Sequence, residues 1–274
     1  MLKITDLHKT FLKGTPNAHH ALRGVNLTLN DGDFVTVIGS NGAGKSTLFN
    51  AIAGSFLCDS GSIVLDGQDI TYVKEHRRAK QISRMFQDPM LGTAPDLTIQ
   101  ENMALAYSKS VKGMLSWALS KQDAQLFRET LAQLNMGIED RMKTKMGQLS
   151  GGQRQAVALM MCTLVTPRLL LLDEHTAALD PVTAEKVLDI TRQVVAKHSI
   201  TTMMITHNIG SALSMGNRTI MMEQGQIVLD LSGEEREKLD VPGLLELYRQ
   251  RYNRELDNDR MLLSQDLHSA GKVE

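Results

Sequence analysis

The stretch Phe34-Val35-Thr36-Val37-Ile38-Gly39-Ser40-Asn41-Gly42-Ala43-Gly44-Lys45-Ser46-Thr47 decides the fold of this 274-residue chain. Its first five residues form an almost continuous apolar run, which is typical of a strand buried on both faces of a sheet. A glycine-rich loop follows at once and leads into a predicted helix. Because ligands of open α/β sheets bind at the carboxyl ends of such strands, this stretch predicts an α/β fold with a binding site at the loop.

The loop has the composition needed to hold phosphate groups. Residues 39–47 contain a glycine, four variable residues and then Gly-Lys-Ser, which is the pattern of a phosphate-binding loop. The glycines let successive amides face inward around the β- and γ-phosphates, and the helix that follows adds the positive end of its dipole. We expect all nine residues to bind nucleotide, with Lys45 supplying a mobile charge and Ser46 a hydroxyl for Mg²⁺.

A second predicted buried strand ends in two carboxylates. Four leucines at 169–172 run into Asp173 and Glu174. The plainest interpretation is a solvated strand end. However, the Mg²⁺ of a bound nucleotide needs an oxygen ligand from a neighbouring strand, and we expect Asp173 to supply it through water. Glu174 is then left to orient an attacking water or to accept its proton.

A third run, Leu149-Ser150-Gly151-Gly152-Gln153, limits the protein families that the sequence can resemble. Alone it predicts only a helix capped by Ser150. Together with the phosphate loop upstream and the Asp-Glu pair downstream, it resembles the signature of the ATP-binding cassette (ABC) family. The resemblance covers almost the whole chain and implies an ATP hydrolase with ATP and Mg²⁺ as cofactors.

The expected fold is α/β, the P-loop NTPase fold of ABC ATPases, with a mainly parallel core sheet. Strand-like pieces at 2–6 and 25–29 predict an antiparallel β subdomain, and 218–231 reads as a closing hairpin. Helical spacing predicts an inserted α-helical subdomain at about 88–166. We expect the ATPase domain to span 1–240 and a C-terminal helix with a polar tail to occupy 241–274.

The resemblance also implies roles for single residues. Phe11 resembles the aromatic residue that stacks on adenine, although a core phenylalanine is the alternative. Gln87 resembles the glutamine that contacts Mg²⁺ or the attacking water, and His207 the histidine that contacts the γ-phosphate. Asp180 resembles the aspartate that communicates across a dimer, but a helix cap before Pro181 explains it equally well. The sequence departs from many relatives at His175, where they carry proline.

The resemblance further implies a head-to-tail dimer. Ser150, Gly151, Gly152 and Gln153 would complete the site built around Lys45 of the partner copy. The catalytic set is then Lys45, Gln87, Glu174 and His207, with Ser46, Gln87 and Asp173 around the metal.

Composition limits the partners and the location. With 30 Lys and Arg against 31 Asp and Glu, the net charge of −1 argues against nucleic acid as a partner. The most apolar stretch, 156–172, is interrupted by polar residues and is too short to span a bilayer. The two cysteines, Cys58 and Cys162, fit a reducing cytosol.

We therefore expect a peripheral subunit at the cytoplasmic face of the membrane that drives separate permease subunits. A freestanding subunit favours an importer with an extracytoplasmic substrate-binding protein, and stretches such as Met85–Pro89 and Leu172–Pro181 look most like importers of aromatic amino acids such as tryptophan or tyrosine. The main alternative is a soluble ABC ATPase of a cytosolic assembly, such as iron–sulfur cluster delivery. A regulatory subunit without turnover is disfavoured because Glu174 is a carboxylate.

Overall fold

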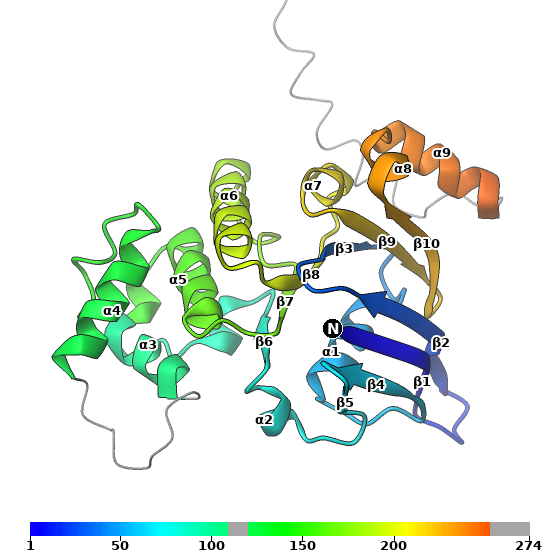
Figure 1. Ribbon diagram of the computed structural model, residues 1–274, viewed down its shortest axis with the longest axis horizontal. Coiled ribbons are helices and arrows are strands. Elements are labelled where there is room, and N and C mark those ends of the chain that lie inside the picture. Colours follow the sequence, from blue (N-terminus) through cyan, green and yellow to red (C-terminus); the bar gives the residue numbers. More distant parts are fainter. Residues whose placement is uncertain (109–119, 253–274) are drawn as a thin grey trace, which may run out of the picture. The chain divides into compact units, whose positions relative to one another are not determined.

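The computed structural model describes residues 1–108 and 120–252, which form two compact units (Figure 1). The first unit contains Met1–Ile52, Phe56–Tyr72 and the described chain from Ile205 onward. The second contains Ala53–Ser55 and Val73–Met204. Both units combine strands and helices, which confirms the predicted α/β class.

The first unit holds a four-stranded antiparallel sheet. Its order is β2 (His19–Leu29), β1 (Leu2–Phe11), β4 (Ser60–Leu65) and β5 (Gln68–Asp69). The two predicted opening strands are confirmed, but both are longer than expected. The register of β1 shifts beyond Ile4, and Asp6 has a φ of +48°. These irregularities break the alternation of buried and exposed residues on which the prediction depended.

The same unit contains the strand before the phosphate loop. β3 (Phe34–Ile38) is buried at every residue, as predicted, and pairs in parallel with β9 (Arg218–Glu223). β9 and β10 (Gln226–Ser232) form the predicted antiparallel hairpin. The helices of this unit are α1 (Lys45–Ala53), which ends at the boundary with the second unit, α7 (Ile209–Ser214), α8 (Gly233–Glu237) and α9 (Val241–Tyr252).

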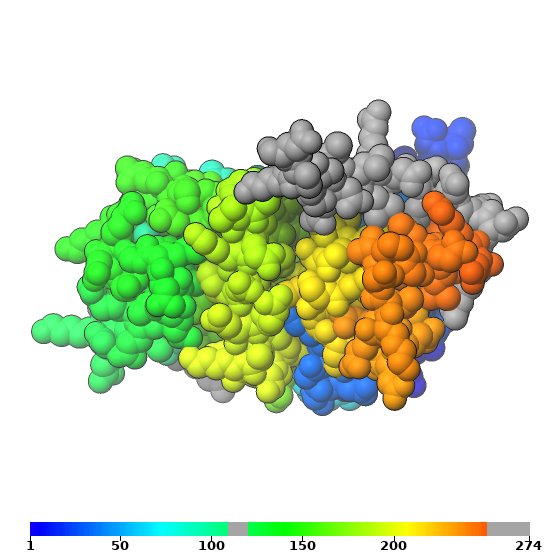
Figure 2. All heavy atoms as spheres, turned by 90° about the horizontal axis from the view of Figure 1, so that it is seen from above, coloured from blue at the N-terminus to red at the C-terminus, as the bar shows by residue number. Residues whose placement is uncertain are grey.

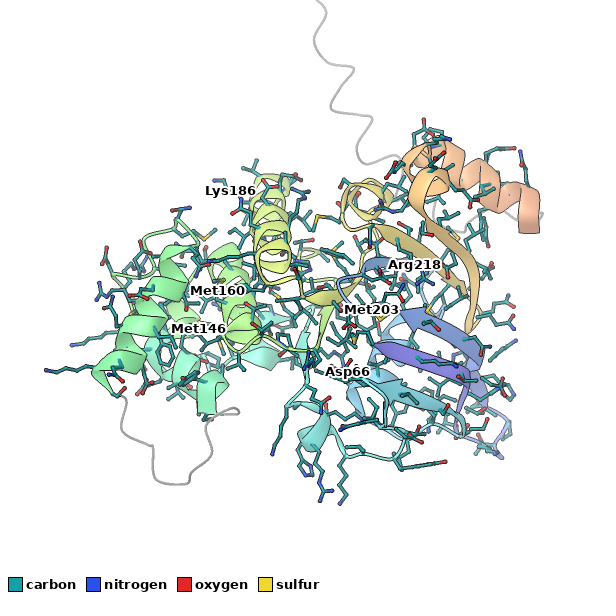
Figure 3. All side chains as sticks on the ribbon, viewed as in Figure 1. Asp66, Met146, Met160, Lys186, Met203 and Arg218 are labelled. Carbon is teal, nitrogen blue, oxygen red and sulfur yellow. The ribbon has the colours of Figure 1, made fainter. Side chains whose placement is uncertain are left out.

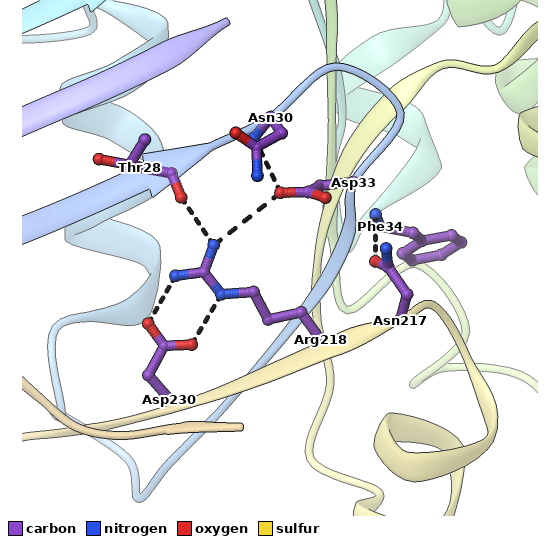
Figure 4. Close-up of polar contacts among 7 residues, drawn as sticks. All are labelled: Thr28, Asn30, Asp33, Phe34, Asn217, Arg218 and Asp230. Carbon is purple, nitrogen blue, oxygen red and sulfur yellow. Dashed lines mark hydrogen bonds and ion pairs between the residues drawn. The ribbon is translucent and has the colours of Figure 1, made fainter. Parts of the chain in front are cut away.

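A cluster around Arg218 fixes the hairpin to β2 (Figure 4). The Arg218 guanidinium donates to both carboxylate oxygens of Asp230 on β10, at 2.7 and 2.5 Å, and to the carbonyl of Thr28 on β2 at 2.6 Å. Asp33 lies 3.9 Å from the same group. The hydrogen bonds with Asp230 raise the pKa of Arg218, and its guanidinium group links β2, β9 and β10.

The second unit carries the predicted buried strand that ends in Asp173, together with further strands of the same sheet. β6 (Ile82–Met85) and β7 (Leu169–Asp173) pair in parallel, and β8 (Thr201–Ile205) follows β7 in the sheet order. Helix α6 (Pro181–His198) connects β7 to β8. The short helix α2 (Glu75–Arg78) precedes β6.

The described residues between β6 and β7 are mainly helical. This segment contains α3 (Ile99–Ser108), α4 (Lys121–Ala132), α5 (Gly151–Thr163) and short 3₁₀ turns at Pro89–Gly92 and Met146–Gln148. Its core includes Phe127, Leu131, Met146 and Met160, all nearly inaccessible to solvent. Figure 3 shows Met146 and Met160 among the side chains of this segment, where methionine fills the packed interior.

The predicted C-terminal helix is present as α9, in which Leu244 and Tyr248 are buried. Residues 253–274, which include the predicted polar tail, lie outside the described residues. Within the described part of the chain, no helix combines the length and apolar character that a bilayer crossing requires. The exact limits of the ATPase domain and its helical subdomain stay predictions.

Candidate nucleotide-binding site

The phosphate loop of the first unit depends on glycine for its close contacts. A Cβ on Gly39, whose φ is +144°, would lie 2.1 Å from the Met222 carbonyl oxygen. A Cβ on Gly44, whose φ is +103°, would lie 2.7 Å from the carbonyl oxygen of Ala21. Only glycine therefore fits both positions. The loop ends where α1 begins at Lys45, so the N-terminus of a helix, with the positive end of its dipole, adjoins the loop.

Lys45 closes back over the loop. Its side chain is buried, and Nζ donates to the carbonyl oxygens of Gly39 at 2.7 Å and Ser40 at 3.0 Å. The ammonium group is therefore held at the mouth of the loop by its own backbone. Ser46 is exposed in the first turn of α1. Lys45 thus offers a fixed cation to a phosphate, and Ser46 offers a hydroxyl to the metal ion that accompanies it.

The same unit brings His207 to the strand end at which the loop begins. The amide of Thr206 donates to the carbonyl of Val37, near the end of β3, at 3.2 Å. His207 is the next residue and is half-buried. The structure thus places the predicted histidine and the phosphate loop at one end of the sheet.

The predicted adenine-stacking residue is not a core residue. Phe11 is 36% exposed at the end of β1, and its ring meets the ring of Phe56 edge to face at a centroid distance of 5.3 Å. Lys9 Nζ lies 5.5 and 5.0 Å from the two ring centroids. The partly exposed aromatic pair offers an apolar surface to a nucleotide base.

In the second unit, the carboxylate of Asp173 is paired with a cation that the sequence analysis did not include. Arg84 Nη2 donates to Asp173 Oδ2 at 2.8 Å, and both side chains are largely buried. Arg84 also lies over the ring of Phe86, 4.7 Å from its centroid. The signal that could have revealed this pair is a charged residue inside a predicted buried strand, because a buried charge requires a partner.

Glu174 stands in an unusual backbone conformation. Its φ of +46° lies in the left-handed region, which is uncommon for a residue with a side chain. The next residue, His175, is buried and bonds through Nε2 to Thr191 Oγ1 of α6 at 3.2 Å. Burial lowers the pKa of His175 to about 4, so this imidazole is neutral near pH 7. His175 therefore anchors the chain directly behind Glu174.

The signature segment begins α5 as predicted. Ser150 and Gln153 form a capping box, in which each side chain accepts a hydrogen bond from the other's backbone amide. Ser150 and Gly151 are exposed, whereas a Cβ on Gly152 would lie 2.1 Å from the Cγ2 of Thr183. The N-terminus of α5 is thus accessible on one side and packed against α6 on the other.

Asp180 and Gln87 each lie at the end of an element in this unit. Asp180 caps α6 and accepts from the Thr183 amide at 3.1 Å, and hydrogen bonding by Thr183 lowers the pKa of Asp180. The helix-cap interpretation of Asp180 is therefore confirmed as its local role. Gln87 is exposed just after β6, and its carbonyl accepts from Gln155 Nε2 at 3.2 Å.

The oxygen donors present suit Mg²⁺ by their chemistry. Ser46 offers a hydroxyl, Gln87 an amide oxygen, and Asp173 a carboxylate whose described ion pair uses only Oδ2. Mg²⁺ prefers such hard oxygen ligands and keeps several of its waters.

The family model described as ABC transporter matches residues 22–177 of the sequence, more than half of its length. The chain belongs to the ABC transporter family. It is similar to the tyrosine transport ATP-binding protein of Clostridioides difficile, with 42% identity over 90% of this chain and 98% of that protein. It is 35% identical to a xylose/arabinose import ATP-binding protein of Sulfolobus acidocaldarius, over 86% of this chain and 89% of that protein.

Solved structures of ABC cassettes share its fold. A dimeric cassette in a post-hydrolysis state with ADP and Pi has a TM-score of 0.73 and 29% identity, over 85% of this chain and 98% of that one. A nucleotide-free ABC transporter cassette has a TM-score of 0.73 and 27% identity, over 90% and 98% of the two chains. The chain is thus the ATP-binding subunit of an ABC transporter and an ATP hydrolase, as predicted.

The sequence analysis did not predict three contacts that the candidate residues make in the structure. They are Arg84 on Asp173, Gln155 on the carbonyl of Gln87, and Phe56 against Phe11. The sequence does not mark Phe56 or Gln155 as a contact of a candidate residue, because neither stands out from the residues around it. Only the tertiary packing identifies them.

Proposed function

We propose that the chain forms a head-to-tail dimer around two ATP molecules and drives separate membrane permease subunits of an importer. The chain has one phosphate loop and one Ser150–Gln153 segment, so two composite sites require two chains. The exposed, capped N-terminus of α5 is suited to face a phosphate of the opposite nucleotide. Solved relatives include dimeric cassettes, which supports this arrangement.

Within a composite site, Lys45 and the loop amides hold the β- and γ-phosphates, and His207 contacts the γ-phosphate. Glu174 orients the attacking water and accepts its proton. Ser46, Gln87 and Asp173 hold Mg²⁺, which neutralises developing phosphate charge when bound. Arg84 orients the Asp173 carboxylate through their ion pair. Loss of the γ-phosphate removes a group that both chains hold, and the dimer opens.

A hollow in the second unit supports contact with a permease. Its volume is about 240 Å³, and its walls include Phe86, Leu91, Ala106 and Met161. Leu91 is 71% exposed and Met90 beside it is 40% exposed. Exposed apolar side chains around a concavity suit a short apolar segment of another protein. We assign this hollow to a helix of the permease, and we place the subunit at the cytoplasmic face of the membrane.

The cargo is proposed to be an aromatic amino acid, tyrosine or tryptophan, delivered by an extracytoplasmic binding protein. The observation that carries this proposal is the match to the tyrosine transport ATP-binding protein, which extends over 98% of that relative at 42% identity. Other relatives are named for sugar import and for glutamine transport at lower identity. The proposed cargo therefore follows the strongest of these similarities.

Uptake measurements in the native host test this function. Deletion of the gene is expected to reduce uptake of labelled tyrosine or tryptophan, and the wild-type gene but not a Glu174→Gln variant is expected to restore it. Unchanged uptake of both amino acids would rule out the cargo.

A separate test addresses the permease. The tagged Glu174→Gln protein, purified from gently solubilised membranes with ATP and Mg²⁺, is expected to retain a polytopic membrane protein. Recovery with cytosolic proteins alone would favour the cytosolic-assembly function instead.

A further inference from the structure

We infer that Tyr248 of the C-terminal helix α9 is a positioning residue for the phosphate loop, acting through Glu223 and the β9–β10 turn. The inference rests on the assignment of residues 39–47 as the nucleotide-binding loop. It assigns to α9 a role in ATP binding that the motifs of the chain do not reveal.

The helix α9 is firmly seated on the first unit. Leu244 and Tyr248 are 0% and 1% exposed, and they belong to one buried cluster with Ile38, Met221 and Leu229. Ile38 is the last residue of β3, directly before the phosphate loop. Figure 2 shows the orange atoms of α8 and α9 beside the yellow atoms of α7, whose Ala212 is part of the same cluster. The helix thus shares one buried cluster with the last residue of the strand that carries the loop.

The Tyr248 side chain also reaches the end of β9. Its hydroxyl donates a hydrogen bond to Glu223 Oε2. A tyrosine ring buried to this extent has its hydroxyl bonded in most proteins, and a charged acceptor makes such a bond strong. Because Glu223 is the last residue of β9, the bond fixes the point at which the hairpin turn begins.

The turn that follows Glu223 touches the phosphate loop. Gln224 and Gly225 have φ values of +46° and +82°, which produces the tight reversal between β9 and β10. The amide of Gly225 donates to the carbonyl of Ala43 at 2.9 Å, and the carbonyl of Gly225 accepts from the Arg23 amide at 2.9 Å. The turn is therefore hydrogen-bonded to the loop on one side and to β2 on the other.

Close packing makes this support stiff. A Cβ on Gly39 would lie 2.1 Å from the Met222 carbonyl oxygen, and a Cβ on Gly44 would lie 3.3 Å from the Gly225 Cα. A displacement of the turn would therefore change the positions of the loop amides that surround the phosphates. The path from α9 to the loop runs through Tyr248, Glu223, Gly225 and Ala43 with a direct contact or one intervening residue at each step.

The test compares Tyr248→Phe with the wild-type protein. The substitution keeps the packed ring and removes only the hydroxyl. ATP affinity is expected to fall by about 5- to 10-fold, which is less than a direct hydrogen bond to a charged group contributes, because Tyr248 acts on the loop only through Glu223 and the turn. The KM for ATP should rise accordingly, while kcat changes less than about twofold. Amide hydrogen exchange of residues 39–45 should accelerate in the free protein.

Three further variants make the result specific. Tyr72→Phe, at a tyrosine that is 72% exposed, is expected to bind ATP like the wild type. Glu223→Gln keeps an acceptor oxygen and should give a smaller loss of affinity than Tyr248→Phe. The double variant should be no weaker than Tyr248→Phe alone, because both changes remove one interaction.

The inference is overturned if Tyr248→Phe binds ATP like the wild type while Lys45→Ala loses binding. If Lys45→Ala also binds ATP normally, the assignment of the phosphate loop itself is wrong. A loss of affinity in Tyr248→Phe with unchanged exchange at 39–45 would likewise contradict a positioning role.

Discussion

At the scale of single residues, Lys45 both stabilises the phosphate loop and supplies the charge that would bind phosphate. Its ammonium group bridges the carbonyls of Gly39 and Ser40 and is the fixed cation of the phosphate loop. A bound phosphate would use the same charge in the ground state and in the transition state. Affinity and turnover therefore depend on one side chain.

We predict that Lys45→Ala lowers ATP affinity at least about 30-fold, since hydrogen bonds to charged groups contribute roughly 2 kcal/mol or more. ATP hydrolysis should be lost with it. Isothermal titration with ATP and a phosphate-release assay measure both effects. Lys121→Ala, at an exposed position of α4, is the matched control. Normal hydrolysis by Lys45→Ala would contradict the site.

His175 gives a prediction about pH. Its pKa is lowered from the ordinary 6.5 to about 4 by burial. Between these values the unfolded chain binds a proton that the folded chain does not, so stability is full above pH 6.5 and falls toward pH 4. The loss is on the order of 3 kcal/mol.

The variant His175→Phe removes this titration. Its free energy of unfolding, from urea denaturation at pH 7 and pH 4.5, is therefore expected to fall less over that interval than that of the wild type. The remaining histidines are common to both proteins, so their effects cancel in the comparison. An equal fall in both would contradict the prediction.

Single residues differ in how far the sequence reveals them. Ser150 could be predicted as a helix cap because a cap needs only local spacing, and the capping box with Gln153 confirms it. Arg84 could not be predicted as the partner of Asp173, since the two residues lie 89 positions apart in sequence. The exposed setting of Phe11 likewise depends on tertiary packing and not on its local pattern.

At the scale of elements, a buried arginine fastens α8 to α7 and β9. Arg236 Nη2 donates to the carbonyls of Ala212 and Leu213, at 3.1 and 3.0 Å, and Nε donates to Thr219 Oγ1 at 2.9 Å. Arg236 is 7% exposed. Those carbonyls belong to the last turn of α7, which lacks donors of its own.

We predict that Arg236→Met, which keeps the volume and removes the donors, lowers the free energy of unfolding by about 3 kcal/mol. The reason is that the buried acceptors on α7 and β9 each lose one hydrogen bond from the guanidinium group. Urea denaturation measures the change. Lys238→Met, two residues later and exposed, should change stability little. A small effect of Arg236→Met would show that water satisfies these carbonyls.

The strands differ in how well their sequence patterns predict them. β3 and β7 could be predicted because each is an uninterrupted buried run. β4 and β5 were not predicted, since β4 is only partly buried and β5 has two exposed residues. Local patterns carry little information about strands that are short or half-exposed.

At the scale of the whole molecule, the two halves of each proposed ATP site come from different chains. The phosphate loop with Lys45 and His207 belongs to the first unit, and the accessible Ser150 segment belongs to the second. Glu174→Gln should bind ATP but hydrolyse it about 10²- to 10⁴-fold more slowly, because the proton acceptor is lost. We expect this variant to accumulate as a dimer with ATP and Mg²⁺.

The most direct measurement is a cross-link between two different chains of the Glu174→Gln protein. One chain carries Asn41→Cys in the phosphate loop and the other carries Ser150→Cys, with Cys58 and Cys162 replaced in both. We predict a disulfide-linked dimer when the two are mixed with ATP, Mg²⁺ and an oxidant. Neither chain alone, nor the mixture without ATP, should give it. Absence of the cross-link, with ATP shown to be bound, would contradict the head-to-tail site.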